Sequence, residues 1–156
     1  MFSKILVPLD GSEVSEKALS MAQNLASSSD TSIHLLQVIS LRPELDARRG
    51  IGGESITVLE MAQDAARRLI EVQTARGKAY LEGIAVQLQK AGISVTTVIR
   101  EGAADDNIVE YAKEQDIDVI VMSTHGRSGF KRFFVGSVTD RVIRSGETPV
   151  LVLPAS

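Results

Sequence analysis

The hydrophobic residues of this chain gather in short continuous runs that alternate with longer amphipathic stretches. Runs such as Ile5-Leu6-Val7 contain no polar residue, which is typical of strands covered on both faces. Five runs rich in β-branched and aliphatic residues predict strands at Lys4–Leu9, Ser32–Ile39, Ser94–Arg100, Asp118–Met122 and Val150–Leu153. The pattern therefore predicts a sheet buried between two layers.

Between these runs the apolar residues recur at helical spacing. Three shorter helices are predicted at Glu13–Ser27, at Ala104–Glu114 and from Ser137 onwards. Ser12 is the expected N-cap of the first. A longer helical region, Ser55–Lys90, would span roughly 50 Å, whereas a domain of this size has a radius of gyration of about 15 Å. We therefore expect this helix to bend near Gly77 or to overhang the domain.

Strands that alternate with helices predict a parallel sheet with right-handed crossovers. We expect one α/β domain over residues 1–156, doubly wound, with helices on both faces of a five-stranded parallel sheet in the order 3-2-1-4-5. Residues 41–54 include Pro43 and Gly50, Gly52 and Gly53, and this composition predicts a mobile loop.

The last predicted strand, Val150–Leu153, is short, apolar and bracketed by Pro149 and Pro154. Proline is tolerated at strand ends and on edge strands, so we expect an edge strand. An exposed apolar edge favours aggregation unless another strand pairs with it. We therefore predict a homodimer through Val150–Leu153.

The composition of the chain excludes several classes of function. Of 156 residues, 44% are hydrophobic and 24% charged, as in an ordinary globular protein. A net charge of -3 and a pI near 5.4 argue against a nucleic-acid surface. The chain has no cysteine, which excludes disulfides and thiolate chemistry. No run reaches the length of a membrane span, so we expect a cytoplasmic protein with no membrane partner.

The segment 123–137, Ser-Thr-His-Gly-Arg-Ser-Gly-Phe-Lys-Arg-Phe-Phe-Val-Gly-Ser, joins the fourth predicted strand to the last helix. Glycines let the backbone turn tightly and approach a ligand closely. The following helix start offers N–H groups and a positive dipole end, which together suit an anion. In a doubly wound sheet this junction and the loop after the first strand meet at the switch point, so the segment predicts a phosphate site there.

The chain resembles the universal stress proteins over nearly its full length. The resemblance rests on Lys4-Ile5-Leu6-Val7-Pro8-Leu9-Asp10-Gly11-Ser12, on Gly136-Ser137-Val138-Thr139-Asp140-Arg141-Val142-Ile143 and on Thr148-Pro149-Val150-Leu151-Val152-Leu153. The nucleotide-binding branch of that family carries glycine, two residues, glycine, nine residues, glycine, then serine or threonine. Gly126 and Gly136-Ser137 fit this spacing, and Ser123 departs from it.

The resemblance implies ATP, or ADP or AMP, with Mg²⁺ or Mn²⁺ accompanying the nucleotide. By analogy, the Val38 backbone meets adenine, Asp10 approaches the ribose or the metal, and amides near Gly126 and Ser137 take the phosphates. The candidate binding residues are Pro8, Leu9, Asp10, Val38, Met122, Ser123, Thr124, His125, Gly126, Arg127, Ser128, Gly129, Gly136, Ser137, Val138 and Thr139.

Other interpretations stay open. Gly126 and Gly129 are also compatible with a simple turn, and Asp10 with a helix start. The chain lacks the P-loop, dinucleotide, nucleophile-elbow and zinc-protease motifs, so no catalytic residue is assigned. Binding is therefore favoured over catalysis, with a regulatory role in a stress response. The alternatives are a stress adaptor that binds no nucleotide and a slow ATPase that uses Asp10.

Overall fold

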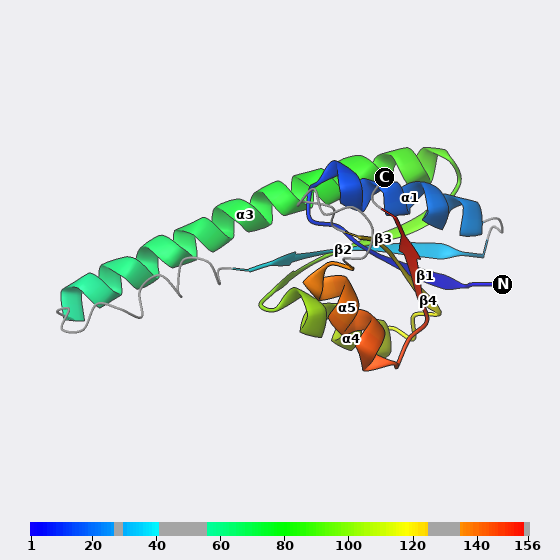
Figure 1. Cartoon of the computed structure of the whole chain (residues 1–156). Coiled ribbons are helices and arrows are strands. Elements are labelled where there is room, and N and C mark those ends of the chain that lie inside the picture. Colours follow the sequence, from blue (N-terminus) through cyan, green and yellow to red (C-terminus); the bar gives the residue numbers. More distant parts are fainter. Residues whose placement is uncertain (27–29, 41–55, 125–134, 155–156) are drawn as a thin grey trace.

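Five parallel strands form the centre of the molecule, and helices cover both of their faces (Figure 1). The computed structural model describes residues 1–26, 30–40, 56–124 and 135–154. The strands are β1 (Lys4–Pro8), β2 (Ser32–Ile39), β3 (Ser94–Glu101), β4 (Val119–Ser123) and β5 (Val150–Leu153). All five were predicted, with boundaries that agree within one residue.

The sheet has the order β3-β2-β1-β4-β5, which confirms the predicted topology. β1 pairs with β2 on one side and with β4 on the other, all in parallel. The winding therefore reverses between β1 and β4. β5 pairs with β4 and forms one edge of the sheet, with all four of its residues half-buried.

One face of the sheet is covered by α1 (Glu13–Leu25) and α3 (Ile56–Lys90). Alternate strand residues point to this side, where Ile5 and Val7 of β1 lie fully buried against Leu81 of α3. Ser12 begins α1 as predicted, because its hydroxyl oxygen accepts the Ser15 N–H at 3.2 Å.

The opposite face is covered by α4 (Ala104–Glu114) and α5 (Ser137–Ser145). Leu6 of β1 and Ile120 of β4 point to this side and pack with Ile108 of α4 and Val142 of α5. The two clusters place the four helices in two layers around the sheet, as Figure 1 shows.

The helix α3 is continuous over 35 residues, and its first half extends beyond the sheet (Figure 1). The expected overhang is therefore confirmed, and the helix continues through Gly77 without interruption. Gly77 is buried, and a Cβ there would lie 2.9 Å from Gln37 Oε1 and 2.9 Å from Ile99 Cδ1. The glycine lets the helix lie close to the sheet at the point where it passes over β2 and β3.

No helix among the described residues is long and apolar enough to cross a membrane. The loop predicted at residues 41–54 lies outside the described residues.

Candidate functional site

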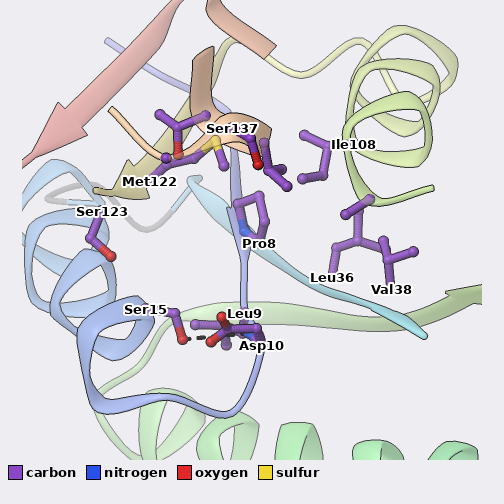
Figure 2. A pocket seen from close by; sticks show the side chains of 14 residues that line it. Pro8, Leu9, Asp10, Ser15, Leu36, Val38, Ile108, Met122, Ser123 and Ser137 are labelled. Carbon is purple, nitrogen blue, oxygen red and sulfur yellow. Dashed lines mark hydrogen bonds between the residues drawn. The ribbon is translucent and has the colours of Figure 1, made fainter. Parts of the chain in front are cut away.

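A cavity of about 380 Å³ opens at the carboxyl ends of the strands, where the winding reverses (Figure 2). Its size falls within the range of small-ligand pockets. The lining comes from β1 and the loop after it, from β2 and β4, and from the first turns of α1, α4 and α5. The lining residues are Pro8, Leu9, Asp10, Ser15, Leu36, Val38, Ala104, Ile108, Met122, Ser123, Gly136, Ser137, Val138 and Thr139.

The loop after β1 is fixed by its own hydrogen bonds. Asp10 Oδ1 accepts the Ser12 N–H at 2.9 Å and the Ser12 hydroxyl at 2.6 Å. The Ser15 hydroxyl in turn donates to the Ser12 carbonyl oxygen at 2.9 Å. Gly11 has a φ of +83°, a left-handed conformation that favours glycine. Asp10 is therefore held at the rim of the cavity in one orientation.

Ser123 occupies the glycine position of the family pattern at the end of β4. Its side chain is buried, and its hydroxyl donates a hydrogen bond to the Val14 carbonyl oxygen in α1. In Figure 2 the hydroxyl points toward α1. The extra atoms of serine therefore fasten β4 to α1, and the cavity stays open beside them.

The start of α5 is the anion-binding element of this cavity. Gly136 stands at its N-cap and provides no side-chain cap, and the first helical bond runs from Asp140 N–H to the Gly136 carbonyl oxygen. The N–H groups before Asp140 have no partner within the helix. They belong to Ser137, Val138 and Thr139, which all line the cavity.

The other two helices that start at the cavity are less suited to an anion. α1 is capped by Ser12 and carries Glu13 and Glu16 in its first turn. α4 carries Asp105 and Asp106 in its first turn, and these carboxylates repel a phosphate. In α5 the acidic residue of the first turn, Asp140, is paired with Arg144 at 2.8 Å. The electrostatics therefore direct a phosphate to α5.

The remaining walls of the cavity are apolar. Leu36 and Val38 come from β2, Ile108 from α4, and Met122 from β4. Figure 2 shows Leu36, Val38 and Ile108 together on one side of the cavity and Ser137 at its upper end. The site thus joins an apolar compartment to an anion-binding helix start, which suits a ligand with a flat apolar part and a charged part.

Most of the predicted binding residues that the structure describes lie together in this cavity. Thr124 does not line it: its backbone N–H donates to the Leu153 carbonyl oxygen of β5 at 2.9 Å. The predicted residues His125, Gly126, Arg127, Ser128 and Gly129 lie outside the described residues.

The prediction missed four lining residues, namely Ser15, Leu36, Ala104 and Ile108. Leu36 could have been found, because it stands beside Pro8 in the register of β1 and β2. Ala104 and Ile108 depend on α4 crossing the end of the sheet, which no local motif signals.

Metal ligands are sparse in the described part of the chain. No group of three or more His, Cys, Asp or Glu residues lies close enough there to hold a metal ion. Asp10, the predicted metal residue, lines the cavity as a single carboxylate, with Oδ1 engaged by Ser12. A metal held by Asp10 would need further ligands beyond the described residues.

The fold and the cavity define a doubly wound α/β protein with a small-ligand site at its switch point. The sequence model of the Universal stress protein family matches residues 1–154. The chain therefore belongs to the universal stress protein family, as its motifs indicated.

Relatives of known name agree with this assignment. The chain is 32% identical to the universal stress protein MJ0577 of Methanocaldococcus jannaschii, over 98% of this chain and 95% of that protein. It is 30% identical to the universal stress protein YxiE of Bacillus subtilis, over 98% of this chain and 99% of that protein. The solved structure of MJ0577 matches with a TM-score of 0.81 and 29% identity, over 99% and 96% of the two chains.

Proposed function

We propose that this protein binds an adenine nucleotide at the cavity and acts as a regulator in a stress response. In this proposal the nucleotide is ATP, ADP or AMP, and its binding alters contacts with a second copy or another partner. The observation that carries the proposal is the start of α5, where the N-cap Gly136 offers no capping side chain and Ser137, Val138 and Thr139 line the cavity beside an apolar compartment.

The phosphate half of the proposal rests on α5. Backbone N–H groups and the positive dipole end of a helix stabilise a phosphate without any lysine. The adenine half rests on the apolar walls, where Val38 is half-buried next to the fully buried Leu36. Val38 is the last residue of β2 that lines the cavity. Its backbone groups therefore lie at the end of the sheet where a bound base would contact them.

Solved structures with the same fold support an adenine ligand. A universal stress protein family protein of Arabidopsis thaliana, 19% identical with a TM-score of 0.64, was solved with AMP bound. Another universal stress protein, 22% identical with a TM-score of 0.58, was solved in complex with cAMP. These likenesses concern the fold, and the ligand of this chain is inferred from its own cavity.

A phosphate series combined with one charged variant tests the proposal. Calorimetry with adenosine, AMP, ADP and ATP should give affinities that rise with the number of phosphates. Ser137→Asp should weaken ATP binding about tenfold or more, because its carboxylate occupies the N–H groups and repels the phosphates. The same carboxylate favours a helix start, so the variant should still fold.

The matched control is Ser20→Asp, which adds an equal charge at an exposed position of α1 away from the cavity. It should leave ATP binding unchanged. Adenosine binding as tightly as ATP would overturn the phosphate assignment, and no heat with any of the four ligands would favour the nucleotide-independent adaptor. If a divalent metal accompanies the nucleotide and Asp10 is one of its ligands, Asp10→Asn should lose the Mg²⁺-dependent part of the affinity for ATP.

A further inference from the structure

The outer face of α3 carries an apolar repeat that the nucleotide site does not use. Val58, Ala65, Val72, Ala79 and Val86 follow one another at intervals of seven residues, and all five are exposed. Valine is a weak helix former because its β-branched side chain is restricted in a helix. Three exposed valines at this spacing are therefore not explained by helix propensity, whereas a seven-residue repeat is the pattern of a helix that packs along another helix.

A second row lies next to the first, three residues further along in each heptad. It consists of Met61, Arg68, Ala75, Glu82 and Gln89, all exposed, with Met61 at 69%. The opposite side of the helix contains the residues that are buried on the sheet, namely Gly77, Leu81, Ala85 and Leu88. The two rows together, which we name the outer stripe, therefore point away from the domain.

The outer stripe is complementary to itself when a second helix runs antiparallel to it. With a two-fold axis at Ala75, residues whose numbers sum to about 150 lie at the same height on the two helices. Val72 then meets Ala79 of the partner subunit and Ala65 meets the partner's Val86, each pair offset by one residue, or about 1.5 Å. Val72 and Val86 thus each meet a small alanine, which allows close packing. The small Ala75 itself lies where the two helices cross the axis.

The charges follow the same register. Glu71 then lies beside Lys78 of the partner subunit, and Arg68 lies beside the partner's Glu82. Because the axis is two-fold, each of these opposite-charge pairs occurs twice. On the other flank the exposed Arg76 lies one residue from the axis, so its two copies come near each other. The four opposite-charge contacts outnumber this like-charge contact, and on this balance charge complementarity favours a second copy of this chain over an unrelated partner.

Within the described residues, the outer stripe is exposed on both halves of α3. The first half of α3 extends beyond the sheet (Figure 1), and the residues of the second half that pack on the sheet, such as Leu81 and Leu88, lie on the side of the helix opposite to the outer stripe. The overhanging half of one helix can therefore cover the exposed second half of the other. The two domains would then lie on the outer sides of a central helix pair.

We infer that two copies of this protein associate through the outer stripe of α3, as an antiparallel helix pair with its two-fold axis at Ala75. This surface is separate from β5 and from the nucleotide cavity. The occupant is a second copy of the same chain, and the contact stands whether or not the cavity binds a nucleotide.

Single cysteines test the register, since the native chain contains none. Ala75→Cys places a thiol at the axis, where two copies can form a disulfide under mild oxidation. The matched control is Ala65→Cys, an exposed alanine in the same stripe whose two copies would be about 30 Å apart. At micromolar concentration, Ala75→Cys should yield about tenfold more covalent dimer than Ala65→Cys on a denaturing gel, as expected if the paired helices prefer the register with Ala75 at the axis.

Charge exchange provides the second test and does not depend on packing at the axis. In the Ala75→Cys background, Lys78→Glu or Glu71→Lys should reduce the covalent dimer, and the combination Glu71→Lys with Lys78→Glu should restore it. Circular dichroism checks that α3 remains helical in every variant.

The outcomes are distinct. The antiparallel helix pair would be overturned by equal disulfide yields from Ala75→Cys and Ala65→Cys. It would also be overturned if Lys78→Glu and Glu71→Lys left the disulfide yield of Ala75→Cys unchanged. A failure of ATP to bind in calorimetry would overturn the proposed function and leave this inference untouched.

Discussion

Single side chains fix the ends of the central strands. Asp118 stands just before β4, and its Oδ2 accepts the N–H of Ser3 at 2.7 Å and the N–H of Lys4 at 2.9 Å. It thereby joins the start of β4 to the start of β1, at the end of the sheet opposite the cavity. These backbone hydrogen bonds, followed by the positive charge of Lys4, lower the pKa of Asp118 below its ordinary value of 3.8.

Asp118→Asn is expected to lower the free energy of unfolding at neutral pH, by less than about 1 kcal/mol because the group is exposed. A carboxylate whose pKa is lowered in the folded state stabilises the fold above its unfolded pKa, and this contribution is lost as the pH falls through the folded pKa. The difference between wild type and variant should therefore shrink between about pH 7 and pH 2. Urea unfolding at several pH values measures it, and a difference independent of pH would contradict the role of the charge.

The role of Ser123 is determined by its surroundings in the folded protein. A side chain at a position where the family pattern has glycine can crowd a ligand. The buried hydroxyl instead donates to the Val14 carbonyl oxygen, so it joins β4 to α1. The residue that departs from the pattern is a structural contact beside the cavity.

At the scale of elements, α3 is the part of the fold that depends most on close packing. Its path over the sheet requires a residue without a side chain at Gly77, where Gln37 and Ile99 lie beneath it. Gly83, six residues later in the same helix, is exposed, and a Cβ there would meet nothing within 4 Å. The two glycines therefore separate helix propensity from packing.

Gly83→Ala should stabilise the protein by about 0.5–1 kcal/mol, because alanine favours the helix and restricts the unfolded chain. Gly77→Ala gains the same propensity but forces Gln37 and Ile99 to shift, so its net effect should fall at least about 1 kcal/mol below that of Gly83→Ala. Thermal and urea unfolding of both variants provide the comparison. Equal stabilisation would show that α3 does not lie close to the sheet at Gly77.

At the scale of the whole molecule, β5 leaves one edge of the sheet unpaired within the described chain. The carbonyl oxygens of Pro149 and Leu153 accept the N–H groups of Ile120 in β4 and of Thr124 just after it, so the backbone N–H and C=O groups of Val150 and Val152 point outward by alternation. A second β5 can pair with this edge. The homodimer through Val150–Leu153 stays a prediction, and so do the cytoplasmic location and the lack of a nucleic-acid partner.

Val152→Pro removes an outward N–H while the bonds of Pro149 and Leu153 to β4 remain possible. We expect this variant to be monomeric in light scattering at micromolar concentration, in a Lys78→Glu background that weakens pairing through α3. Val152→Thr keeps the backbone donor and serves as the control that should still dimerise. A Val152→Pro protein that dimerises like its control would exclude β5 as the interface.

The sequence by itself determined the order and bounds of the elements. Hydrophobic runs are local, so they place β2 and β5 at the observed residues, and Ser12 is a local cap. The alternation of strands and helices then leaves few topologies, and the observed order is the predicted one. The part of the site formed by the ends of β1 and β4 follows from that topology alone.

Only the tertiary structure decided which distant residues meet. Ile108 lines the cavity because α4 crosses the end of the sheet, and α3 needs a glycine at position 77 because Gln37 and Ile99 of the sheet lie against it. The outer stripe likewise becomes visible only when the opposite face of α3 is seen to be buried. The local sequence pattern determines the secondary structure of each segment. Packing between segments determines which side chains remain accessible to a ligand or to a second copy of the chain.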